Sequence, residues 1–145
     1  MNPIRGEHGQ RPEPGWLSLL FYLGLSLFAC HELDAVLREE WRLLPVLSSL
    51  ETAQGYFWFV LTHIPLFTLI FWLCGHDDPR IRRRARLVVD LFMIVHMGLH
   101  ALLSGDPLYR FEGPLEAITV YGAAGVAALH RLLLLWAGRR RRRSE

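Results

Sequence analysis

A set of ionisable side chains lies inside or at the edge of apolar stretches of this chain, and their types are those that bind metals or move protons. They are four histidines, His31, His63, His96 and His100, and three carboxylates, Glu32, Asp34 and Glu116. Ionisable groups within a bilayer are costly and usually functional. Neutral imidazole and carboxylate are common ligands of Zn²⁺ and non-haem iron. We therefore predict the histidines as metal ligands and the carboxylates as further ligands, proton acceptors or ring-orienting groups.

Spacing supports a shared site for these residues. His96 and His100 are four residues apart and so share one face of a helix, where two imidazoles can bind one ion without strain. If the apolar stretches cross a membrane alternately, a rise of about 1.5 Å per residue places all the candidates within roughly 10 Å of depth near one face. The His-x-x-x-His spacing is common, and the sequence contains no complete zinc signature.

Other interpretations of the same residues stay open. Facing histidines in a membrane bundle could be axial ligands of haem. A buried carboxylate and imidazole could isomerise an apolar substrate without a cofactor, or carry protons for a transporter. The polar layer could also hold together a metal-free structural or helper subunit. Asp90 and His130 fit either a structural pair or a proton path, and Glu39, Glu40 and Arg42 are expected to form a solvated face.

The elements that must position these side chains are four apolar stretches. The chain has 145 residues, of which 52% are hydrophobic, and its mean hydropathy is +0.21. The stretches cover about 16–36, 56–74, 87–104 and 115–137, each close to the length that a hydrocarbon layer of about 30 Å requires. The sequence thus predicts an all-α, four-helix transmembrane bundle over 16–137. We expect a flexible lead at 1–15, an Arg-rich tail at 138–145, and an amphipathic surface segment at 38–50.

The basic residues orient this bundle. All 16 are arginine, and they concentrate at 5–11, 80–86 and 139–143. An even number of spans places these three regions on one side, and positive residues favour the cytoplasmic side. Both termini are therefore predicted to be cytoplasmic, in a bacterial inner membrane, with the histidine site toward the periplasm. The terminal arginines directly follow an apolar stretch, so we expect lipid contact and no nucleic acid binding; a homo-oligomer remains open.

Four short segments also carry a family resemblance. They are 31–35 (His-Glu-Leu-Asp-Ala), 40–45 (Glu-Trp-Arg-Leu-Leu-Pro), 63–67 (His-Ile-Pro-Leu-Phe) and 96–100 (His-Met-Gly-Leu-His). They resemble a family of small bacterial four-helix membrane proteins of unknown function, over most of 16–137. The chain is also distantly similar to the family named for an intramembrane His-x-x-Glu-Glu motif, from which it departs at Asp34 and Ala35. The resemblance implies a membrane location and no established activity, so it assigns no catalytic residue.

Overall fold

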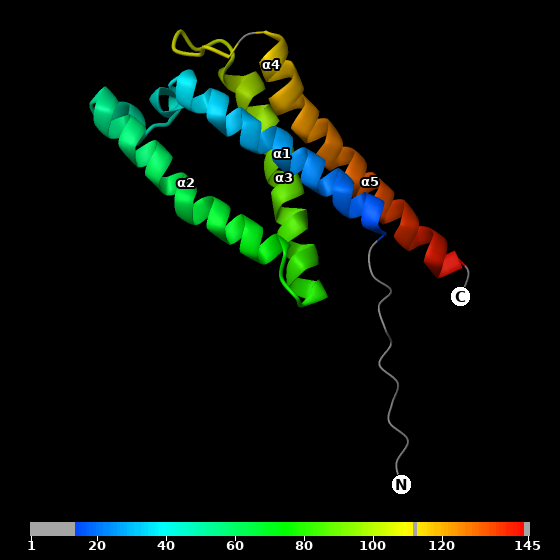
Figure 1. The fold of residues 1–145 in the computed structure, drawn as a ribbon. Helices are drawn as coiled ribbons and strands as arrows, with labels where there is room; N and C mark the ends of the chain where they lie inside the picture. Colours follow the sequence, from blue (N-terminus) through cyan, green and yellow to red (C-terminus); the bar gives the residue numbers. More distant parts are fainter. Residues whose placement is uncertain (1–13, 112, 144–145) are drawn as a thin grey trace.

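The computed structural model describes residues 14–111 and 113–143, and these residues are helical with no strand among them (Figure 1). Three long helices are α1 (Gly15–Leu37), α2 (Thr52–Cys74) and α3 (Pro79–Leu103). The fourth long helical segment is continuous from α4 (Pro114–Glu116) through the π-helical turn η3 (Ala117–Tyr121) into α5 (Gly122–Arg143). The predicted flexible lead falls almost wholly outside the described residues, since α1 already begins at Gly15.

All four long helical segments, the last running over Pro114–Arg140, are long and apolar enough to cross a membrane. This confirms the predicted all-α fold with four spanning helices, and it indicates a multi-pass membrane protein. The start of α1 and the end of α5 lie at the same end of the bundle (Figure 1).

Two helix ends differ most from the boundaries of the apolar stretches. Helix α3 begins at Pro79 instead of residue 87, because Asp78 accepts a hydrogen bond of 2.7 Å from the backbone N–H of Arg80 and Pro79 suits a first helical turn. Helix α5 likewise continues through the arginines to Arg143 instead of ending near residue 137. Arginine is a good helix former and can extend its charged end toward water, so apolar content alone underestimates both helices.

Helices α1, α3 and α5 form the packed core of the bundle. Phe21, Leu25 and Phe28 of α1 pack with Met93 of α3 and with small side chains of α5, Ala123 among them. Small residues allow close helix contact in membranes. Helix α2 contributes less to this core: Cys74 belongs to it and Phe67 packs against it, but most of the helix is exposed on the outside of the bundle (Figure 1). Its main contacts are with α3 and with the connection after α1.

The connection after α1 turns back over the end of the bundle. Glu39 has a left-handed backbone (φ 58°), and two short 3₁₀ turns follow, η1 (Glu40–Leu43) and η2 (Leu47–Ser49). Trp41 is buried against Gly55, where an added Cβ would lie 2.7 Å from Trp41 Cδ1. The expected surface segment is therefore partly folded inward, and this places Glu40 over the bundle interior.

Candidate metal centre

Four side chains from α1, η1 and α3 converge on one point. His31, Glu40, His96 and His100 each offer a ligand atom, and these atoms all lie within 4.8 Å of one another. His31 Nε2 lies 2.9 Å from His96 Nε2 and 3.4 Å from Glu40 Oε2, and His100 Nε2 lies 3.9 Å from Glu40 Oε1. Two atoms bound at about 2.0–2.1 Å to one tetrahedral zinc lie roughly 3–3.5 Å apart. The four groups are thus close to the spacing of a single coordination sphere.

The helices present these rings because of where each residue falls on its face. His96 and His100 lie one turn apart on α3, and His31 is fully buried on the facing side of α1. The three ring centroids form a nearly equilateral triangle with sides of 4.9, 4.7 and 4.8 Å. Phe28 and Phe111 pack against this triangle and hold the rings in place.

A hydrogen-bonded chain behind His100 fixes the tautomer of its ring. The hydroxyl of Tyr109 donates to the carboxylate of Glu116, so the Tyr109 oxygen is left to accept the proton of His100 Nδ1 at 3.0 Å. With its proton on Nδ1, His100 directs the lone pair of Nε2 toward the other ligand atoms. Burial, and then the hydrogen bond with Glu116, raise the pKa of the Tyr109 hydroxyl. This arrangement is typical of groups that orient metal-binding histidines.

Several buried polar atoms of the group have no hydrogen bond within the described part of the chain. They include His31 Nδ1, Glu40 Oε2 and His100 Nε2. An unsatisfied buried polar atom costs about 1–3 kcal/mol. Burial raises the pKa of Glu40, but the close contact with His31, whose Nε2 lies 3.4 Å from Glu40 Oε2, and the other two imidazoles lower it by more, so the net pKa lies below its ordinary value. A cation bound here would satisfy the lone pairs of His100 Nε2 and Glu40 Oε2 together.

Glu40 is the member of this group that the sequence did not indicate. Its side chain is only 12% exposed, so the prediction of a solvated face was wrong for this residue. The neighbouring residues behave as expected: Glu39 pairs with Arg42 at 3.0 Å and with Arg110 at 2.9 Å on the outside. The adjacent Trp41 indicates that this segment docks inward, but it does not specify which neighbouring side chain turns toward the imidazoles.

The remaining predicted site residues lie elsewhere. His63 is outside the group and binds Glu32 instead, with its Nε2 2.8 Å from Glu32 Oε2 and its Nδ1 2.6 Å from the carbonyl oxygen of Phe59. Successive helical residues point about 100° apart, so His31 faces α3 while Glu32 faces α2. Asp34 pairs with Arg38 at 3.3 Å, away from the imidazoles.

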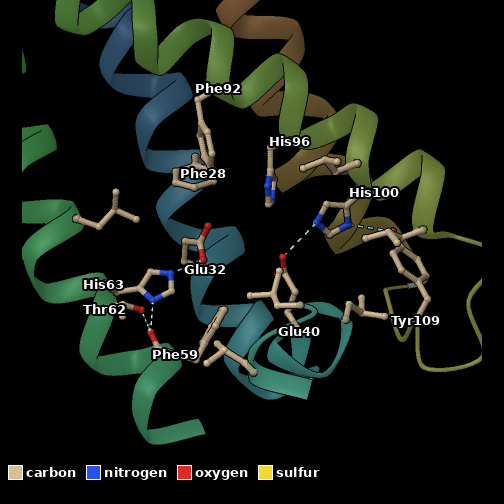
Figure 2. A pocket seen from close by; sticks show the side chains of 16 residues that line it. Phe28, Glu32, Glu40, Phe59, Thr62, His63, Phe92, His96, His100 and Tyr109 are labelled. Atoms are coloured by element: carbon tan, nitrogen blue, oxygen red, sulfur yellow. Dashed lines mark hydrogen bonds and ion pairs between the residues drawn. The ribbon is translucent and has the colours of Figure 1, made fainter. Parts of the chain in front are cut away.

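A cavity of about 290 Å³ connects these two polar groups. Figure 2 shows His96, His100 and Glu40 on one side of it and the Glu32–His63 pair on the other. Between them the lining is apolar and largely aromatic, and the lining residues Leu66, Phe92 and Leu99 are 42%, 44% and 47% exposed. These half-exposed side chains on α2 and α3 place the mouth of the cavity toward the lipid.

The chain belongs to a family of unknown function (DUF6713), whose family model matches residues 17–137. The expected membership in an uncharacterised family is thereby confirmed, and the distant likeness to the His-x-x-Glu-Glu family stays a prediction. No curated protein and no solved structure matches the chain. Any functional conclusion therefore depends on the geometry of the site.

Proposed function

We propose that this chain is a membrane metalloprotein that holds one divalent transition metal ion, Zn²⁺ or Fe²⁺, and acts on a lipid-soluble molecule. The ligands would be His31, His96, His100 and Glu40. The observation that carries the proposal is the convergence of three imidazoles and one carboxylate within 4.8 Å of one another, with His31 and His100 buried.

The donor set supports this choice of metal. Imidazole and carboxylate suit zinc and iron, while the group includes no thiolate that would favour copper(I). His96, His100 and Glu40 line the cavity, so a molecule in the cavity would reach the centre from the lipid side. The bound metal would supply a Lewis acid, or a redox couple in the case of iron. The chain's own residues would bind the molecule, orient it and exclude water.

The distribution of arginine supports a location for the centre. The Arg-rich first turns of α3 and the Arg-rich end of α5 lie at the end of the bundle opposite to the centre. Since positive residues favour the cytoplasmic side, we place both termini in the cytoplasm and the centre toward the periplasmic side of a bacterial inner membrane.

The geometry favours a single ion over haem. A haem iron between two imidazoles needs space for the macrocycle between the rings, and His31 Nε2 lies 2.9 Å from His96 Nε2. A metal-free structural role would leave buried lone pairs unsatisfied, His100 Nε2 among them. A cofactor-free isomerase would not need the third imidazole.

The proposal is tested by loading the purified, metal-stripped protein in nanodiscs with Zn²⁺ or, without oxygen, with Fe²⁺. We expect about one tightly bound ion per chain, because three imidazoles and one carboxylate supply up to four ligands. His76→Gln is the matched control, because His76 lies at the opposite end of α2 and should not change the stoichiometry. Binding that stays the same after His100→Ala would contradict the proposal.

A further inference from the structure

The cavity is lined by a second polar pair, Glu32 and His63, which is not part of the proposed metal centre. Glu32 and His63 face it from α1 and α2, opposite to the proposed ligands (Figure 2). The side chains of the pair are 11% and 20% exposed, so both are largely removed from solvent and lipid. Placing a carboxylate and an imidazole beside an apolar space in a membrane is energetically costly, and such groups are usually functional.

The hydrogen bonds of this pair define what it can offer to a bound molecule. A backbone carbonyl only accepts, so His63 Nδ1 carries the proton shared with the Phe59 oxygen at 2.6 Å. In the ion pair of a protonated His63 and an ionised Glu32, His63 Nε2 donates to Glu32 Oε2 at 2.8 Å, so both ring nitrogens are used. The polar atom of the pair left for a bound molecule is thus the other oxygen of Glu32. A carboxylate oxygen accepts hydrogen bonds, so the molecule must donate one.

The other residues that line the cavity indicate the shape and size of the apolar part of the bound molecule. Phe28, Phe59 and Phe92 line the cavity together with leucines, which suits a planar ring. The volume of about 290 Å³ lies at the lower end of the range of small-molecule sites, about 300–1,000 Å³. A ring system of one or two rings fits this space, while any longer tail would extend through the mouth between α2 and α3 into the bilayer.

We infer that the cavity binds a lipid-soluble aromatic alcohol, with its ring among the phenylalanines and its hydroxyl donating to Glu32. The hydroxyl then lies between Glu32 and the group formed by His96, His100 and Glu40. That such a molecule is the substrate rests on the proposed metal centre, whereas its binding depends on the cavity alone.

The test compares two probes that differ by one hydrogen-bond donor, 2-naphthol and 2-methoxynaphthalene. Their dissociation constants are measured by fluorescence titration of the protein in phosphatidylcholine nanodiscs, with empty nanodiscs as the reference for partition into lipid. A hydrogen bond to a charged acceptor predicts that 2-naphthol binds about tenfold or more tightly than the ether. Glu32→Gln should reduce this ratio by about tenfold, and Asp34→Asn, on the same helix but outside the cavity, should leave it unchanged.

The same titrations carried out on zinc-loaded and on metal-stripped protein separate the two proposals. Equal affinity for the two probes, or a ratio that Glu32→Gln leaves unchanged, overturns the inference about the cavity whatever the zinc content. Failure to bind zinc overturns the proposed function, while the probe ratio still tests the cavity. If Glu32→Gln does not fold, Leu66→Trp serves instead: it should fill the mouth and abolish binding of both probes, and unchanged binding contradicts the site.

Discussion

The bundle buries imidazole and carboxylate groups in two regions, and they are built differently. Near one end, His31, His96, His100 and Glu40 converge beside a cavity with lone pairs that have no partner within the described chain. In the other half of the bundle, Asp90 and His130 are fully buried and form a direct pair, here called the inner pair, with His130 Nδ1 2.8 Å from Asp90 Oδ2. This inner pair lies outside the lining of the cavity, and Arg131 Nη1 approaches it at 3.9 Å.

The difference shows what separates a binding site from a structural contact in a membrane. Both regions bury histidine, so burial alone does not identify a ligand. The inner pair joins one imidazole to one carboxylate across α3 and α5, so that His130 Nδ1 and Asp90 Oδ2 satisfy each other; Asp90 Oδ1 is the one oxygen of this carboxylate without a hydrogen bond in the described part of the chain. The outer region brings three imidazoles to one carboxylate, which leaves more acceptors than donors. That excess of lone pairs is what a cation satisfies.

The largest expected effect comes from removing two outer imidazoles. His96→Ala combined with His100→Ala should reduce bound zinc from about one to below about 0.1 equivalent, because two of four ligands are lost. Elemental analysis of the protein after dialysis measures this. The inner-pair variant His130→Gln is the comparison and should keep its zinc. Equal loss of zinc in both variants would show that the two regions are not distinct in function.

The inner pair should instead control stability. His130→Ala leaves the carboxylate of Asp90 buried without its imidazole, so the free energy of unfolding should fall by about 3–5 kcal/mol. Denaturant unfolding in detergent micelles measures this change. Replacing both residues with leucine should recover most of the loss, since no charge then remains buried. A single substitution that costs nothing would mean that the pair does not hold α3 to α5.

An intermediate effect is expected from the groups behind His100. Tyr109→Phe removes the hydroxyl that accepts from His100 Nδ1, so zinc affinity should fall by about 10–100-fold while the stoichiometry at saturation stays near one. Competition with a chelator of known affinity measures the dissociation constant. Tyr121→Phe, on the exposed side of the same region, is the control. If both variants bind zinc equally well, the chain through Tyr109 does not orient His100.

The smallest effect concerns a carboxylate that belongs to neither region. The hydrogen bond from the backbone N–H of Arg80 lowers the pKa of Asp78, which precedes α3. A lowered folded-state pKa means that the carboxylate stabilises the protein at higher pH and that this contribution is lost as the pH falls through the folded pKa. The melting temperature of Asp78→Asn should therefore be lower than that of the wild type at pH 6, and the two should converge well below pH ~4.

Asp77→Asn serves as the control for this last comparison, because Asp77 engages its neighbours through its backbone oxygen. A difference between wild type and Asp78→Asn that persists unchanged to low pH would contradict the role assigned to the Asp78 carboxylate.

The sequence predicted the helices well because each is marked by a continuous apolar stretch, and it predicted the shared face of His96 and His100 because their spacing matches one turn. The role of Glu40 was out of reach, since it depends on the left-handed turn at Glu39 and on Trp41 docking against Gly55, which is a contact between separate elements. The position of His63 was also out of reach, because the depth of a residue does not reveal how its helix is rotated or tilted.

In the proposed centre, one metal ion is held by side chains from α1, η1 and α3. X-ray absorption at the zinc edge of the loaded protein in nanodiscs tests this directly. We expect three imidazole nitrogens and a carboxylate oxygen at about 2.0–2.2 Å from the zinc, with the imidazole signal reduced in His100→Ala. A shell of oxygen atoms only, or a spectrum that His100→Ala does not change, would contradict it.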